Sequence, residues 1–156
     1  RPRTARQGST VRGLSVGVVM SFSDLLKSAK AAERESRTVQ VTVGGELVSI
    51  TVAELPGLDW ATITAKYPPR ADSPADRGVG FNAHAVSVDA AKVNGVVEFD
   101  GEETRPSDED WDDLFASLGG HDFNQVCDAV FYLNEWLPRQ RVTAAKKALK
   151  GSSKKS

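Results

Sequence analysis

The clearest hydrophobic pattern lies in the last third of the chain, where apolar residues recur at intervals of three and four. The first stripe follows a capping box at residues 107–110 and ends at a pair of glycines; its members are Trp111, Leu114, Phe115 and Leu118. The second stripe begins at once and stops at Pro138; its members are Phe123, Val126, Cys127, Val130, Phe131, Leu133 and Leu137. Two amphipathic helices with a short connection predict an αα-hairpin whose apolar stripes face each other.

A different period governs residues 38–52, where valine and isoleucine alternate with other residues. The alternating positions are Val39, Val41 and Val43 before Gly44-Gly45, and Val48, Ile50 and Val52 after it. Because glycine readily adopts the positive φ angles of a tight hairpin turn, this segment predicts a two-stranded β-hairpin. Two strands alone are marginally stable, so we expect the hairpin to pack on helices or to add to another sheet.

Weaker patterns predict the remaining elements. We expect helices at residues 21–35, 58–66 and 82–92, the last capped by Asn82, and a short strand at residues 96–99. Residues 71–80 are interpreted as a loop after the helix-stopping sequence Tyr67-Pro68-Pro69-Arg70. Past Pro138, residues 142–149 favour a basic helical extension and residues 151–156 a flexible tail. The predicted fold class is α+β, mainly α, with a small β-hairpin packed on several helices and a C-terminal αα-hairpin.

We expect one globular α+β domain at residues 20–138, flanked by two unlike segments. A length of 156 residues suits one domain rather than two. Residues 1–19 show no helical or strand periodicity, so we interpret them as a disordered leader or a spurious N-terminal extension. Met20, the only methionine, is then the expected start. Residues 139–156 form the basic helical and flexible tail.

Charge is distributed unevenly, although the net charge is only -1. Nine acidic residues fall between residues 98 and 113, opposed only by Arg105, whereas the last eighteen residues carry seven basic residues and no acid. The acidic run suits the solvated first turn of a helix, where carboxylates favour the positive end of the helix dipole. The basic tail has no comparable structural explanation and is the segment that most needs a functional one.

The sequence offers little of the chemistry that an enzyme or a metal site requires. Cys127 lies on a helical stripe, where a buried thiol behaves as a small apolar residue. His84 and His121 stand apart in the sequence without a patterned carboxylate, and neither a calcium loop nor a phosphate-binding glycine pattern occurs. We therefore expect no enzymatic activity, no catalytic or metal-binding residues and no cofactor. No apolar run approaches the roughly 20 residues that cross a bilayer, so we expect no membrane partner.

Taken in order, the segments of residues 38–137 resemble the tail assembly chaperones of long-tailed (siphovirus-type) actinobacteriophages and prophages. The resemblance begins with the valine-rich hairpin, a short helix containing Trp60, and the Tyr67-Pro68-Pro69-Arg70 stop. It continues with Gly80-Phe81-Asn82 at a helix start, then with a segment at 107–118 in which a serine and three acids precede Trp111. It closes with residues 120–136, which include Leu133-Asn134. The order and spacing of these pieces carry the resemblance.

The resemblance implies a chaperone that binds the long, hydrophobic tape measure protein, keeps it soluble and helps recruit tail tube subunits. The implied partners are the tape measure protein, the major tail (tube) protein and a longer form of the chain made by a programmed frameshift, with a homo-oligomer as a further option. The implied location is the host cell cytoplasm, and the protein is expected to be absent from the mature virion. The candidate partner-binding residues are Trp136, Phe131, Phe115 and Trp111. Three of them suffice as core, and Trp136, beside the expected helix end, is the preferred exposed anchor.

Two other functions stay open at this point. A structural tail completion or connector protein, retained in the virion, fits the same resemblance. A small nucleic-acid-binding regulator fits the basic tail, but that tail holds no aromatic residue for base stacking and the rest of the chain is acidic.

Overall fold

The computed structural model describes residues 19–154, so the interpretation of residues 1–18 as a leader lies outside the described residues. The chain divides into two compact units, one ending at Glu33 and one beginning at Arg34. Within the described residues, the first unit contains one helix, α1 (Phe22–Ala31), and the second contains a β-sheet and the other helices.

Helix α1 begins where the sequence predicts, because the Ser21 hydroxyl accepts a hydrogen bond from the Asp24 amide at 3.1 Å. None of its residues is buried, and Phe22, Leu25 and Leu26 are exposed. The prediction that this helix extends to Glu35 is wrong. The Glu35 carbonyl accepts a hydrogen bond from the Glu54 amide at 2.8 Å, so Glu35 extends the pairing of the sheet instead of the helix.

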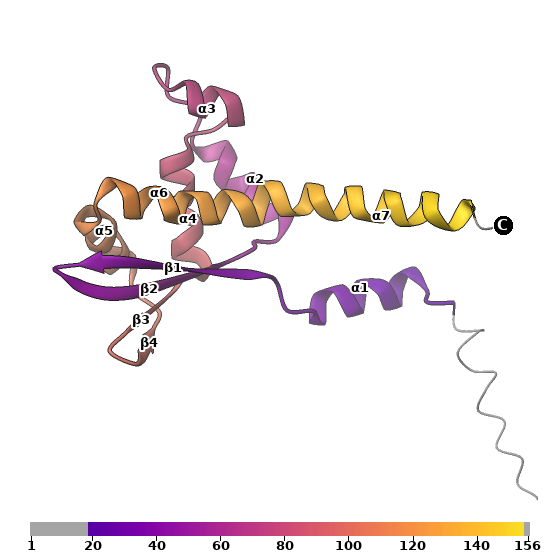
Figure 1. The fold of residues 1–156 in the computed structure, drawn as a ribbon, viewed down its shortest axis with the longest axis horizontal. Coiled ribbons are helices and arrows are strands. Elements are labelled where there is room, and N and C mark those ends of the chain that lie inside the picture. The colour runs from indigo at the N-terminus through magenta and orange to yellow at the C-terminus, as the bar shows by residue number, and fades with distance from the viewer. Residues whose placement is uncertain (1–18, 155–156) are drawn as a thin grey trace, which may run out of the picture. The chain divides into compact units, whose positions relative to one another are not determined.

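The sheet is antiparallel, with four strands in the order β1 (Ser36–Val43), β2 (Glu46–Ala53), β3 (Val96–Phe99) and β4 (Glu102–Thr104), as Figure 1 shows. The predicted hairpin is confirmed, since Gly44 and Gly45 have φ angles of 58° and 82° and join paired strands. The predicted strand at 96–99 is also present. The sequence interpretation missed β4, although Asp100 and Gly101, at φ angles of 52° and 77°, form the same kind of turn.

One face of the sheet is buried and the other is polar. Val41 on β1 pairs with Val48 on β2, and both are buried together with Ile50 and Val52. Thr38 and Thr51 lie opposite each other on the other face, with their hydroxyl oxygens 2.7 Å apart. Alternation along each strand therefore sends the valines and isoleucine towards the helices.

The helices of the second unit before the C-terminal region are α2 (Gly57–Lys66), α3 (Pro74–Val79), α4 (Ala83–Asn94), α5 (Asp108–Ser117) and α6 (Gly120–Phe131). Helix α3 contradicts the loop expected at residues 71–80. The Ser73 hydroxyl caps its start by accepting from the Asp76 amide at 3.2 Å, Pro74 occupies its first turn, and Gly80, at a φ of 91°, ends it. These short-range signals were present in the sequence.

Helix α4 lies at the centre of the second unit, in contact with β2 and with helices α2, α3, α5 and α6. Its buried residues are small: Val86, Ser87, Ala90 and Ala91. Small side chains let neighbouring elements approach closely, and the buried Ser87 hydroxyl is satisfied by donating to the Ala83 carbonyl at 2.7 Å. The predicted C-terminal helix pair is present as α5 and α6. Both helices pack on α4, and their stripes meet at the Phe115 and Phe123 rings, 5.6 Å apart.

The prediction that a helix ends at Pro138 is wrong. Helix α6 continues through a π-helical turn, η1 (Tyr132–Trp136), into α7 (Leu137–Ser153), and the three run as one continuous helix in Figure 1. Proline lacks an amide hydrogen and clashes with the carbonyl four residues before it in a regular α-helix. In the π turn the Leu137 amide instead donates to Tyr132, five residues back, and the wider turn accommodates the proline ring. Helix α7 also includes Gly151, which was assigned to the flexible tail.

Candidate partner-binding surface

The structure separates the four candidate partner-binding residues by their exposure. Trp111 is a core residue, only 1% exposed, and the half-buried Phe115 stacks on it with ring centroids 5.6 Å apart. Phe131 is half-buried and packs against the core. Trp136 is 46% exposed. Of these four residues, Trp136 therefore offers a partner the largest free aromatic surface.

Trp136 belongs to a stack of three side chains that we call the Trp136 ladder, formed by Arg37, Tyr132 and Trp136. The Tyr132 and Trp136 rings are nearly parallel, with centroids 5.0 Å apart, as their spacing of one helical turn allows. The guanidinium carbon of Arg37, on β1, lies 3.6 Å from the Tyr132 ring centroid, which is cation–π distance. The ladder holds the Trp136 ring in place and leaves 46% of the residue exposed.

The sequence interpretation missed the other two members of the ladder. Tyr132 could have been found, because it precedes Trp136 by four positions and shares its helix face. Arg37 could not, because only the packing of β1 beside α6 brings it to the aromatic rings.

The other side of the same turn is fixed by polar contacts to α2 and to the segment that leads into it. Glu135 accepts a hydrogen bond from the Trp60 indole nitrogen at 2.7 Å and another from Arg139 at 3.0 Å. Asn134, which is buried, accepts from the Leu55 amide at 2.8 Å and donates to the Val130 carbonyl at 2.9 Å. The π turn is therefore anchored from two directions, which gives the Trp136 ladder a rigid base.

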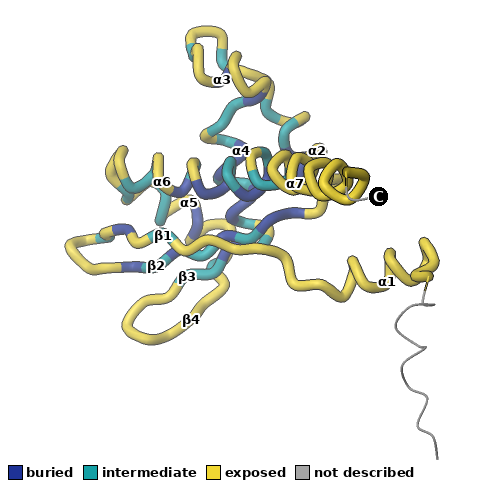
Figure 2. Tube along the Cα trace, turned by 45° about the vertical axis from the view of Figure 1, so that its right-hand side comes forward, coloured by how far each residue is buried: buried dark blue, intermediate teal, exposed yellow. Residues whose placement is uncertain are grey.

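Arg141 anchors the start of α7 to the sheet. Its guanidinium donates to both carboxylate oxygens of Glu54, at 2.8 and 2.7 Å, and lies 3.6 Å from Glu35. The hydrogen bond to Glu54 raises the pKa of Arg141 above its ordinary value. Beyond this clamp every residue of α7 is exposed (Figure 2).

The exposed part of α7 is amphipathic. Val142, Ala145 and Leu149 fall at i, i+3 and i+7 on one stripe, and Val142 and Leu149 are 54% and 71% exposed. Lys146 and Lys150 lie along one flank of that stripe, as their positions one residue further along the helix require. An apolar stripe beside lysines is left without a partner within the described part of the chain.

A hollow of about 260 Å³, which we call the β3–α5 groove, opens between the sheet and helix α5. Its lining is almost entirely apolar: Val43, Val48, Val97, Phe99, Thr104, Pro106, Asp110 and Leu114. The nine acidic residues between positions 98 and 113 are all exposed. Among residues 19–154 only Asp112 of these nine forms an ion pair, with Lys92 at 2.7 Å. Of these acidic residues, Asp110 lines the groove and Glu102 pairs with Phe99 on the groove face of the sheet, so the groove combines an apolar floor with an acidic edge.

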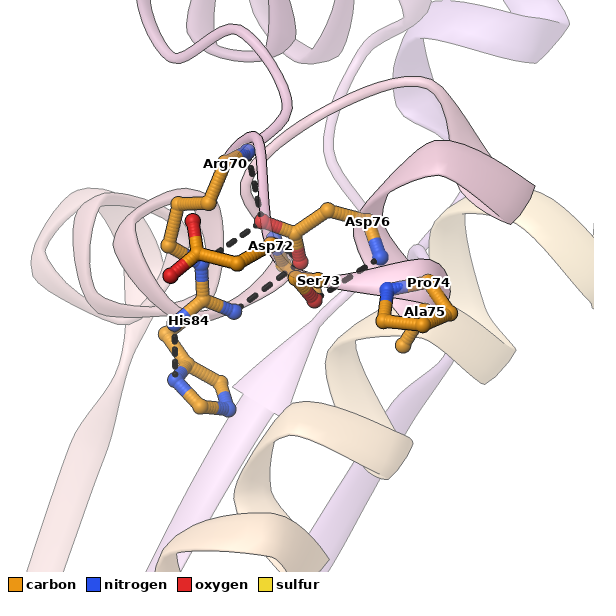
Figure 3. A pocket seen from close by; sticks show the side chains of 8 residues that line it. Arg70, Asp72, Ser73, Pro74, Ala75, Asp76 and His84 are labelled. Carbon is orange, nitrogen blue, oxygen red and sulfur yellow. Dashed lines mark hydrogen bonds and ion pairs between the residues drawn. The ribbon is translucent and has the colours of Figure 1, made fainter.

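A second hollow, of about 490 Å³, lies beside α3 and is lined by Arg70, Asp72, Ser73, Pro74, Ala75, Asp76, Ala83 and His84 (Figure 3). Asp76 is fully buried and accepts from the Arg70 side chain at 2.7 and 2.9 Å, from the Arg70 amide at 3.1 Å and from the Ala83 amide at 3.3 Å. The Arg70 side chain lowers the pKa of Asp76 far below its ordinary range. This carboxylate is saturated with donors, and it ties α3 to the start of α4.

The remaining chemically reactive side chains are dispersed. Burial raises the pKa of the Cys127 thiol, so the nucleophilic thiolate is disfavoured there. Within residues 19–154, no three or more His, Cys, Asp or Glu side chains gather in a way that could hold a metal ion. Among the helices that the structure describes, none is long and apolar enough to cross a membrane.

Comparison of the chain with protein-family models, with curated proteins and with solved structures finds no match.

Proposed function

We propose that this protein is a tail assembly chaperone of a long-tailed bacteriophage or prophage, which binds the tape measure protein through the Trp136 ladder. The observation that carries the proposal is an aromatic ring 46% exposed yet held in place by Tyr132 and Arg37. A rigid, exposed aromatic residue is the usual anchor of a protein-binding surface. The tape measure protein is a long helical chain, and its apolar side chains would supply the complementary stripe.

The order of the structural elements also supports the proposal. The segments that carry the resemblance fold as the hairpin β1–β2, helix α2 with Trp60, helix α4 capped by Asn82, and the pair α5 and α6. An anchor that recurs on many chaperone copies along one client would bind through avidity, so each contact needs only modest strength. The same proposal includes recruitment of the major tail (tube) protein and partnership with a frameshifted longer form. It also includes action in the host cell cytoplasm and absence from the virion.

The contribution of Trp136 can be estimated from its exposure. A tryptophan buries about 150–250 Å² in all, so covering the exposed part removes roughly 70–115 Å² from water, worth about 2–3 kcal/mol. Losing that contribution weakens binding about 30-fold or more. The test is coexpression of the chain with the tape measure protein of the same genome, followed by measurement of soluble tape measure protein and of pull-down.

Wild-type chain should keep the tape measure protein soluble, and Trp136→Ala should lose most of that effect. The matched control is Leu58→Ala, which truncates a residue 84% exposed on α2 and should behave as wild type. Circular dichroism checks that both variants are folded. Failure of the wild-type chain to bind the tape measure protein would sink the proposal.

A second function is favoured by one observation, the exposed lysines of α7. A nucleic-acid-binding regulator would use them for phosphate contacts and would bind DNA with a steep salt dependence. A structural tail protein is separated by a different measurement, because it would be abundant in purified particles by mass spectrometry and a chaperone would be nearly absent.

A further inference from the structure

We infer that the chain assembles head to tail, with the exposed part of α7 from one copy seated in the β3–α5 groove of the next. Both surfaces are apolar, and the charged residues beside them have opposite signs. The groove offers an apolar floor that includes Val97, Phe99 and Leu114. Helix α7 offers a stripe of Val142, Ala145 and Leu149 that nothing in the described chain covers.

The charges beside the two surfaces favour α7 of another copy as the occupant of the β3–α5 groove and favour one orientation of that helix. Lysines flank the stripe of α7, and Asp110 stands in the wall of the groove. On the sheet side, Glu102 pairs directly with Phe99 and so lies on the same face, beside the floor. An apolar stripe with a basic flank therefore meets an apolar floor with acidic residues at its edge, which favours both encounter and register.

Two simpler arrangements conflict with the structure. Helix α7 cannot fill the groove of its own chain, because the Arg141–Glu54 clamp fixes its start and the helix runs away from α5 and from β3–β4 (Figure 1). Pairing of α7 with α7 from a second copy would bring together two helices that each carry five basic residues and no acidic residue. Like charges at such a contact repel. The groove of another copy is the surface that satisfies both the stripe and its lysines.

The geometry has a further consequence. Residues 142–153 extend about 18 Å at a rise of about 1.5 Å per residue, which is long enough to lie along a groove rather than touch it at one point. Each copy carries one α7 and one groove, so the contact is heterologous and leads to a ring or an open filament. This assembly needs no client, and its test is independent of the tape measure protein.

The test uses the purified full chain in analytical ultracentrifugation. The wild-type mass should rise with concentration in about 0.05 M salt, and the association should weaken in about 1 M salt, where the charges are screened but the apolar contact remains. Leu149→Glu, which spoils the stripe, and Phe99→Glu, which spoils the groove, should each weaken self-association at least tenfold. The control Leu58→Glu introduces the same charge at a residue 84% exposed elsewhere and should assemble as wild type. Circular dichroism verifies folding of each variant.

The decisive sample is an equimolar mixture of the Leu149→Glu and Phe99→Glu chains. The intact α7 of the Phe99→Glu chain can bind the intact groove of the Leu149→Glu chain, whereas every other pairing is spoiled. The mixture should therefore form dimers and nothing larger. A wild-type chain that stays monomeric in low salt, or a mixture that forms no dimer, overturns the inference. So does a monomeric wild-type chain whose lysines bind a fluorescent DNA duplex instead.

Discussion

Asn134 offers the sharpest test of how the helix continues past Pro138. Its side chain is buried in the π turn and joins two segments, accepting from the Leu55 amide at 2.8 Å and donating to the Val130 carbonyl at 2.9 Å. Truncation to alanine leaves the buried Leu55 amide without a partner, at a cost of about 1–3 kcal/mol, and removes a second hydrogen bond worth about 1 kcal/mol. We therefore expect Asn134→Ala to lower the free energy of unfolding by about 2–4 kcal/mol.

Urea denaturation followed by tryptophan fluorescence and far-UV circular dichroism measures this loss. The matched control is Asn124→Ala, the same substitution at an exposed position of α6, which should change stability by less than about 0.5 kcal/mol. Thermal melting should show the same ranking, at about 3–5 °C per kcal/mol for a unit of this size. Equal stabilities of the two variants would refute the claim that Asn134 anchors the turn.

Three further predictions concern packing, acid and thiol chemistry. Gly95→Ala should cost about 1–3 kcal/mol in urea denaturation, because its Cβ would clash with the Ala91 carbonyl oxygen and would lie 2.7 Å from the Trp111 ring. Gly119→Ala, with nothing near its Cβ, should cost less. The pKa of Asp76 is lowered in the folded state, so the ionised carboxylate stabilises the fold fully above about pH 4, its unfolded pKa, and this stabilisation is lost as the pH falls further. Asp76→Asn should therefore flatten the acid limb of a profile of unfolding free energy against pH. Burial raises the pKa of Cys127 in the folded chain. A disulfide reagent at about pH 8 should therefore react at least tenfold more slowly with the folded chain than with the urea-unfolded chain, and equal rates would contradict this prediction.

Much of the secondary structure was readable because its signals are local. Ser21, Asn82 and Ser107 each cap a helix by accepting from an amide three residues ahead, so a few neighbouring positions determine each helix start. The Gly44-Gly45 turn and the alternation around it likewise predict a hairpin that the structure contains. The missed strand β4 and helix α3 were signalled just as locally, by Asp100-Gly101 and by Ser73 with Pro74.

The candidate surface depended on contacts between distant segments. The sequence pattern placed Trp111 on an apolar stripe and Trp136 beside an expected helix end; in the structure the first is 1% and the second 46% exposed, because α5 packs on α4 whereas Tyr132 covers only part of Trp136. Arg37 reaches Tyr132 only through the packing of β1 against α6.

The passage of the helix through Pro138 shows why tertiary structure decides such cases. By itself the sequence determined where helices start, how the hairpin turns and which stripes are apolar, since these follow from hydrogen bonds and steric limits within about four residues. A proline within that range disfavours a regular helix, and the sequence alone ends one there. Bonds from Leu55 and Trp60 to Asn134 and Glu135 stabilise the wider turn, and those partners are brought close only when the sheet and α2 pack against the helix.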